Sequence, residues 1–222
     1  MNSLTEQIAI CVEKGKLNMS SPYPPQMKGL PGADELTRQA LEEGVRPDEI
    51  LNDALVPAMN RVGQLFSENK IFVPQMLLSA KAMGASMNHL KPFFQTGEVK
   101  RKGVFIMGTV FGDLHDIGKN LCCMMVEGAG WEVIDLGVDV KAEKFLDELD
   151  KRPEAIVGLS ALLTTTMTNM ETIVSAIREK YPQTKVAVGG APVNNDFASQ
   201  IRADAYSKDP QGLIEWLDGI IA

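Results

Sequence analysis

The spacing of apolar residues changes near residue 100 of this 222-residue chain, and that change limits the folds it can adopt. Between residues 34 and 94 apolar side chains recur every three or four positions, which predicts amphipathic helices. After Gly103 short apolar runs alternate with amphipathic stretches, which predicts strands alternating with helices. The sequence therefore predicts a helical bundle followed by an α/β domain.

The first half of the chain is expected to form a small bundle, to which a helix near residues 3–15 could belong. Asp48 is predicted to cap a helix that begins near Glu49, and Pro74 suits the first turn of another helix. The segment 18–32 is so rich in proline and glycine that we predict a loop without regular structure.

The second half contains five short apolar runs, of which the last is weak, at residues 104–107, 132–136, 155–159, 185–188 and 204–206. Helices are predicted near residues 117–129, 141–150, 167–180, 193–202 and 210–221. This alternation implies a doubly wound parallel sheet of five strands, with a flavodoxin-like (Rossmann-like) strand order. Ligands bind such sheets at the carboxyl ends of the strands, so we expect the loops after the first, third and fourth strands to form the site.

The polar and charged segment between the two halves is interpreted as a linker. This gives a helical cap domain at residues 1–94, a linker at 95–102 and an α/β domain at 103–222.

Charge and cysteine content exclude several classes of protein. The formal net charge is -7 and Lys and Arg do not cluster, which argues against binding to nucleic acid. Cys11, Cys122 and Cys123 form no C-x-x-C pair, so we expect small buried residues rather than disulfides or a zinc site. The sequence predicts neither a signal peptide nor a membrane span, and we expect a soluble cytoplasmic protein.

The loop after the first predicted strand contains the strongest candidate for chemistry, His115. An imidazole that binds a metal needs its second nitrogen hydrogen-bonded, and Asp113 lies two residues away. Gly112 and Gly118 would let the backbone approach a bulky ligand closely. From these residues alone, a loop histidine whose bonds are satisfied by its neighbours remains the simpler alternative.

Residues 113–118 match the pattern D-x-H-x-x-G, and the chain resembles the cobalamin-binding domains of methionine synthase and the small corrinoid proteins of methyltransferase systems. Residues 160–164, after the third predicted strand, resemble the S-x-L-x-T element of that family. Gly189 and Gly190, after the fourth, resemble its G-G pair. Residues 62–75 are similar to its cap pattern V-G-x-L-F-x-x-x-K-x-F-x-P-Q.

The resemblance implies that cobalamin is the cofactor, with its own benzimidazole displaced and His115 bound to cobalt as the lower axial ligand. Asp113 would bond the distal nitrogen of His115, and the hydroxyl of Thr166 would complete the relay. The other cofactor contacts that it implies in this loop are Gly112, Leu114, Asp116, Ile117 and Gly118.

The same resemblance implies contacts outside that loop. Ser160, Leu162 and Thr164 would touch the nucleotide tail of cobalamin. Gly189 and Gly190 would leave space for the tail, although a tight turn between strand and helix is the alternative for this pair. In the cap, the residues that would shield the upper face of the corrin are Phe66 and Val73.

In function, the resemblance implies a methyl carrier that cycles between Co(I) and methyl-Co(III), a non-autonomous subunit rather than a complete enzyme. Its partners would be a substrate-specific methyltransferase, a second methyltransferase with a tetrahydrofolate-type acceptor, and a reductive activator. Methylamines, methanol, betaines and aromatic methyl ethers are all possible donors. The alternatives are a cobalamin-dependent sensor, which needs a basic DNA-binding module, and a mutase subunit, which usually lacks the cap pattern of residues 62–75.

Overall fold

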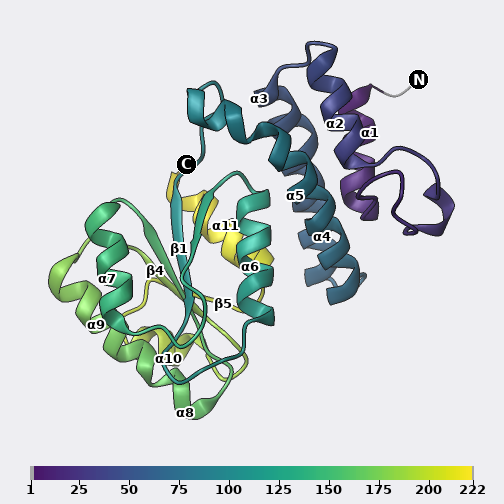
Figure 1. Cartoon of the computed structure of the whole chain (residues 1–222). Coiled ribbons are helices and arrows are strands. Elements are labelled where there is room, and N and C mark those ends of the chain that lie inside the picture. Colours follow the sequence, from purple (N-terminus) through teal and green to yellow (C-terminus); the bar gives the residue numbers. More distant parts are fainter. Residues whose placement is uncertain (1–2, 222) are drawn as a thin grey trace. The chain divides into compact units, whose positions relative to one another are not determined.

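The computed structural model describes residues 3–221, which form two compact units (Figure 1). The first consists largely of the residues up to Arg101, and the second largely of those from Lys102 onward. Within the described residues, no helix has the length and apolar character needed to cross a membrane.

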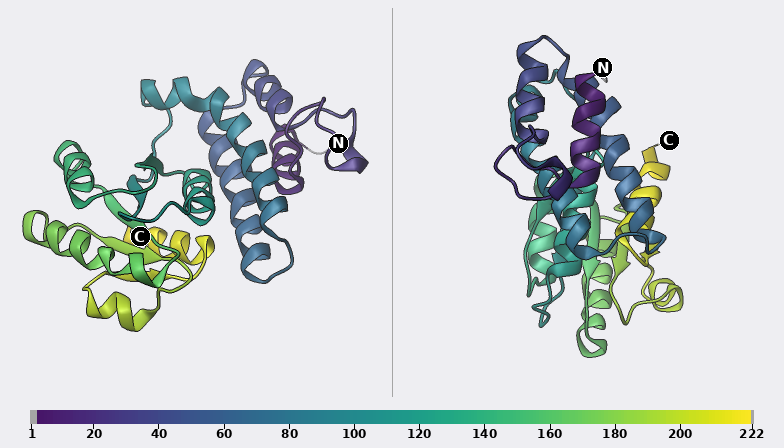
Figure 2. Two further views of the ribbon diagram at one scale, coloured as in Figure 1. Left: turned by 60° about the horizontal axis from the view of Figure 1, so that its bottom comes forward. Right: turned by 90° about the vertical axis from the view of Figure 1, so that its right-hand side faces the viewer.

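The first unit is a bundle of helices that pack side by side (Figure 2). Its main members are α1 (Leu4–Lys14), α2 (Ala33–Glu42), α4 (Val56–Ser67) and α5 (Val73–Thr96). Helix α1 begins with a capping box between Ser3 and Glu6 and ends at Gly15, which adopts the left-handed conformation that favours glycine. The buried faces supply an apolar core that includes Ile8, Val12, Leu36, Ala40, Met59, Val62, Met76, Met83 and Leu90.

The structure corrects the predicted start of the helix near Glu49. Helix α3 (Pro47–Glu49) has Arg46 at its N-cap position, and Asp48 lies inside the first turn, where it pairs with Arg46 at 3.2 Å. Pro47 already has a helical φ, so the helix begins one residue before Asp48, the predicted N-cap residue. A π-helical segment, η2 (Ile50–Leu55), then leads into α4.

Three further predictions for this part of the chain have mixed outcomes. Pro74 does lie in the first turn of α5, as predicted. The loop at residues 18–32 contains one short 3-10 helix, η1 (Pro25–Met27), so the prediction of no regular structure was wrong there. Pro25 fixes φ near the value that a 3-10 turn requires. Helix α5 continues to Thr96, so the predicted linker at residues 95–102 begins in helix.

The second unit is built on a parallel sheet with the order β2-β1-β3-β4-β5, which confirms the predicted flavodoxin-like fold. The strands are β1 (Val104–Thr109), β2 (Glu132–Asp135), β3 (Ile156–Ser160), β4 (Val186–Gly189) and β5 (Ala205–Ser207). The helices are α6 (Ile117–Gly128), α7 (Ala142–Lys151), α8 (Thr164–Met167), α9 (Asn169–Lys180), α10 (Asn195–Gln200) and α11 (Pro210–Ile221). The helix predicted near residues 167–180 corresponds to α9, and the short helix α8 that precedes it was not predicted.

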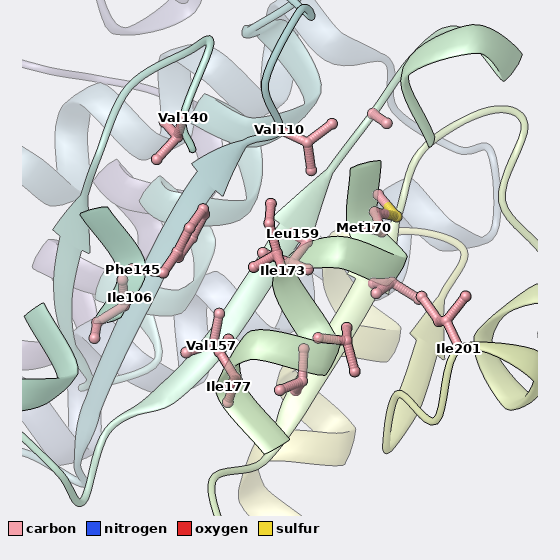
Figure 3. Packing of buried hydrophobic residues seen from close by; sticks show 14 of the residues in the cluster. Ile106, Val110, Val140, Phe145, Val157, Leu159, Met170, Ile173, Ile177 and Ile201 are labelled. Atoms are coloured by element: carbon pink, nitrogen blue, oxygen red, sulfur yellow. The ribbon is translucent and has the colours of Figure 1, made fainter. Parts of the chain in front are cut away.

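The central strands are apolar because helices cover both faces of the sheet (Figure 1). On one face, Ile106 of β1 and Val157 of β3 pack against Phe145 of α7 and Ile173 of α9 (Figure 3). Because neighbouring strands pair in parallel, their carboxyl ends lie at one edge of the sheet.

The cysteines lie in both units; Cys11 and Cys123 are buried as predicted, whereas Cys122 is half-buried. Burial raises the pKa of the Cys11 thiol to about 11 and that of the Cys122 and Cys123 thiols to about 12. These thiols therefore stay protonated at neutral pH and behave as small apolar side chains.

Replacement of Phe145, which is fully buried, by alanine should leave a cavity under the sheet. We expect Phe145→Ala to lower the free energy of unfolding by about 3–5 kcal/mol. Urea denaturation followed by tryptophan fluorescence measures this, because both tryptophans, Trp131 and Trp216, belong to the second unit. The exposed Ile221→Ala is the control and should change stability by less than about 0.5 kcal/mol. Equal stability of the two variants would contradict the assigned core.

Candidate functional site

Four residues lie side by side at the carboxyl edge of the sheet. Thr109 of β1 pairs with Ser160 of β3, Ser160 pairs with Gly189 of β4, and Gly189 pairs with Ser207 of β5. The sequence predicted Ser160 and Gly189 as site residues, and the register now places both in one row. Thr109 and Ser207 were not predicted.

A tight turn follows β1 and leads directly into the D-x-H-x-x-G segment. The amide of Asp113 donates to the carbonyl of Val110 at 3.1 Å, and Gly112 has a φ of 81°. A positive φ at the third residue, after a residue with negative φ, is the pattern of a type II turn, which favours glycine there. Gly112 is therefore needed by the turn itself, whatever ligand approaches it.

The carboxylate of Asp113 is fully buried and accepts hydrogen bonds on both oxygens. Its Oδ1 accepts from the backbone amide of His115 at 3.0 Å and contacts Nδ1 of the His115 ring at 2.8 Å. Its Oδ2 accepts from Oγ1 of Thr166 at 2.6 Å and from the amide of Leu162 at 2.8 Å. The predicted chain from His115 through Asp113 to Thr166 is thus present as a set of contacts.

These bonds determine the charge of Asp113. Burial acts to raise its pKa, but hydrogen bonds from the Thr166 hydroxyl, the amides of His115 and Leu162 and the His115 ring hold that pKa well below its usual range. Asp113 is therefore an anion at neutral pH, and the proton between it and His115 belongs to Nδ1. In the neutral imidazole, Nε2 keeps its lone pair for a metal.

His115 itself is open to the surroundings on its other side. Its side chain is 51% exposed, whereas Asp113 beneath it is not exposed at all. The hydroxyl of Thr109 donates to the backbone carbonyl of His115 at 3.1 Å, which fixes the peptide from which the ring projects. The site thus presents a single oriented imidazole at the carboxyl edge of the sheet.

Large apolar side chains are exposed on the loops around this imidazole. Leu114 is 71% exposed and Ile117 is 69% exposed, while the half-exposed neighbours are Phe111, Leu162 and Leu163. A Cβ at Gly118 would have no neighbouring heavy atom within 4 Å among residues 3–221, so packing within the chain does not explain this glycine. An apolar rim and an open glycine beside one imidazole fit a metal whose equatorial ligands come from a large flat macrocycle.

The two glycines after β4 have close protein neighbours. A Cβ at Gly190, whose φ is 125°, would lie 1.8 Å from the carbonyl oxygen of Ala161. A Cβ at Gly189 would lie 3.0 Å from the carbonyl oxygen of Ser207. Packing and backbone conformation therefore already require glycine at 190, and the idea that the pair leaves a slot for the nucleotide tail stays a prediction.

The remaining predicted residues are placed as follows. Asp116 precedes α6 and accepts from the Asn120 side chain at 2.9 Å, and Thr164 is the exposed first residue of α8. Phe66 on α4 and Val73 at the start of α5 belong to the first unit and are half-buried. Their shielding role therefore stays a prediction.

Sequence reasoning missed two side chains that hold the turn after β1. Oδ1 of Asp139, in the loop after β2, accepts from the amide of Gly112 at 2.7 Å. Nδ2 of Asn169, the first residue of α9, donates to the carbonyl of Phe111 at 2.7 Å. The fold rule directed attention to the loops after the first, third and fourth strands, and an isolated Asp or Asn carries no pattern of its own.

The fold and the candidate site fit a protein that holds a metal macrocycle at the carboxyl edge of a parallel α/β sheet. Comparison with known families makes this specific. Residues 103–210 match a family model described as a B12 binding domain, and residues 31–91 match a second model with the same description.

Relatives of known function agree with the family models. Trimethylamine corrinoid protein 1 of Methanosarcina acetivorans is 34% identical over 193 residues, which span 85% of this chain and 89% of that protein. Dimethylamine corrinoid protein 2 of the same organism is 39% identical over 171 residues, which span 76% of this chain and 79% of that protein. The chain belongs to the corrinoid proteins of methyltransferase systems, and cobalamin is its cofactor.

Solved structures show the same architecture. The methanol:cobalamin methyltransferase complex MtaBC from Methanosarcina barkeri contains a chain with a TM-score of 0.81 and 30% identity, and the match covers 98% of this chain and 79% of that chain. A cobalamin-binding protein from Desulfitobacterium hafniense has a TM-score of 0.74 and 27% identity, and the match covers 98% of both chains.

The lowered pKa of Asp113 predicts how acid affects the second unit. A carboxyl with a lowered folded pKa stabilises the fold above the unfolded pKa, near 4, and this contribution is lost as the pH falls toward the folded pKa. We therefore expect Asp113→Asn to reduce stability at pH 7 and to flatten the decline of the unfolding free energy between about pH 4.5 and 2.5.

Urea denaturation of the wild type and Asp113→Asn at a series of pH values measures this slope. Asp147→Asn removes an exposed carboxylate of α7 and serves as the control, which should keep the wild-type slope. An unchanged slope in Asp113→Asn would show that this carboxylate does not make the bonds described above.

Proposed function

We propose that this protein binds cobalamin with its benzimidazole displaced, that His115 is the lower axial ligand, and that the protein carries a methyl group between two methyltransferases. The observation that supports this most directly is the contact between Nδ1 of His115 and the buried Asp113 at 2.8 Å, which leaves Nε2 for cobalt. When bound, cobalamin supplies a cobalt centre that can take a methyl group from one partner and give it to another.

The residues around His115 would act on the orientation of its ring. Asp113 stays ionised and holds Nδ1–H, and Thr166 fixes Asp113 through its hydroxyl at 2.6 Å. Because the pKa of Asp113 is so low, a proton of the imidazole stays on His115 rather than passing to the carboxylate. In this protein Asp113 therefore acts as an orienting anion.

We further propose that the nucleotide tail lies along the carboxyl edge of the sheet. The row of Thr109, Ser160, Gly189 and Ser207 supports this, because it combines hydroxyls with a position where side-chain volume is small. Leu162 and Thr164 follow Ser160 directly and would border the same region.

Phe66 and Val73 are proposed to shield the upper face of the corrin. Both lie within the residues matched by the second B12-binding model, and both keep part of their apolar surface exposed. Apolar cover of this kind excludes water from a reactive centre. The family assignment favours such a carrier over the sensor and the mutase subunit.

The partners are inferred from the relatives. The related complex MtaBC is a methanol:cobalamin methyltransferase, and the related corrinoid proteins are named for dimethylamine and trimethylamine. We propose that a substrate-specific methyltransferase for a small methylated amine or alcohol loads this protein. A second methyltransferase with a tetrahydrofolate-type acceptor would unload it, and a reductive activator would restore the carrier after oxidation.

The visible spectrum of the protein after reconstitution with hydroxocobalamin and desalting tests the proposal. The wild type should retain the corrinoid and show a spectrum with benzimidazole displaced and histidine bound. His115→Ala should lose the histidine-bound features and bind at least about tenfold more weakly. The only other histidine, His89, pairs with Asp34 at 2.7 Å in the first unit, so His89→Gln is the matched control. A folded wild type that retains no corrinoid would refute the carrier function.

A further inference from the structure

The peptide between Phe111 and Gly112 is held at both of its polar groups by side chains from other parts of the unit. Its carbonyl accepts from Nδ2 of Asn169 at 2.7 Å, and its N–H donates to Oδ1 of Asp139 at 2.7 Å. This peptide is the central one of the turn that ends at Asp113. Two side chains therefore bond opposite ends of a single peptide group.

The central peptide decides the type of a turn. Types I and II differ by a rotation of this peptide through about 180°, which reverses its carbonyl and its N–H. In this chain such a rotation would break the bond to Asn169 and the bond to Asp139 at once. It would also move Gly112 from its φ of 81° to a negative value. The two bonds consequently favour the type II form over its alternative.

Asp139 makes a second contact with the same turn. Its backbone amide donates to the carbonyl of Asp113 at 3.0 Å. Asp139 itself has a φ of 56°, a conformation that aspartate and asparagine tolerate better than most residues. Asp139 thus bonds the turn at two points, the amide of Gly112 and the carbonyl of Asp113. Its own backbone conformation is compatible with both bonds.

We propose that Asp139 and Asn169 are positioning residues that lock the Phe111–Gly112 peptide and thereby aim Asp113 and His115 at cobalt. This inference rests on the proposed role of His115 as the axial ligand. Asp113 is the last residue of the locked turn, and the His115 ring is held by the Asp113 carboxylate at 2.8 Å. A change in the turn would therefore alter the position of His115 through Asp113 alone.

A set of variants distinguishes the effect of losing the Asp139 hydrogen bond from the effect of backbone strain at this position. Asp139→Gly removes the acceptor but accepts the positive φ without strain, whereas Asp139→Asn keeps both an acceptor oxygen and tolerance of that φ. Asn169→Ala removes the bond to the carbonyl of Phe111. Glu143→Ala, an exposed position in the first turn of α7, is the control for a lost surface carboxylate.

The first measurement uses the protein without cofactor. Long-range ¹H–¹⁵N spectra at pH 8 report which nitrogen of His115 carries the proton, and assignment is simple because the chain has two histidines. We expect the wild type, Asp139→Asn and Glu143→Ala to show the proton on Nδ1. Asp139→Gly and Asn169→Ala should shift a measurable fraction of the molecules to the Nε2–H form, which free imidazoles prefer.

The second measurement is a titration with hydroxocobalamin. Asp139→Gly and Asn169→Ala should each raise the apparent Kd about tenfold, with weaker histidine-bound features in the spectrum. Because both residues hold the same peptide, the double variant should lose little more than either single variant. Asp139→Asn should restore binding to within about twofold of the wild type, which a role in overall folding alone would not predict.

The positioning role of Asp139 and Asn169 is refuted if Asp139→Gly and Asn169→Ala keep the wild-type tautomer and the wild-type Kd. It is also refuted if the two variants' effects on the Kd simply add in the double variant. Such a result, with a wild type that binds cobalamin through His115, would leave the proposed function intact. If the wild type bound no cobalamin, the proposed function would fail instead, and the tautomer measurement would still decide whether the lock orients His115.

Discussion

A carboxylate that is taken out of water needs strong hydrogen-bond donors, and the rest of the site follows from how Asp113 obtains them. The donors come from the loop after β1, from the backbone after β3 and from Thr166 of α8. These segments meet only when β1 and β3 lie side by side in the sheet. The orientation of His115 therefore depends on the folded sheet as well as on its own loop.

Much of the fold could be predicted from the sequence because burial imposes patterns on it. Strands covered on both faces, such as β1 and β3, appear as continuous apolar runs, and the parallel order follows from their alternation with helices. The start of α3 was predicted wrongly because capping propensity at Asp48 competed with the preset φ of Pro47. The π-helical segment η2 has no pattern that distinguishes it from an α-helix in sequence.

Within the site, the sequence predicted what a motif can encode and missed what only the fold brings together. Asp113 and His115 are two residues apart, and Thr166 follows from the resemblance to the family. Asp139 and Asn169 lie 27 and 58 residues from the groups they hold, and nothing in their local sequence marks them. At Gly190 the motif suggested more than the structure requires. The family pattern pointed to space for a ligand, whereas the close carbonyl of Ala161 already excludes a side chain at this position.

The buried network under His115 also bears on the thermodynamics of cofactor capture. The Asp113 carboxylate already has its hydrogen-bond partners before any ligand arrives, and the ring above it is already held in one tautomer. The conformational entropy of this arrangement is lost when the chain folds and need not be lost again when cobalt is bound. If His115 is the axial ligand as proposed, this preorganisation makes affinity depend mainly on displacing the benzimidazole from cobalt and on ordering the nucleotide tail.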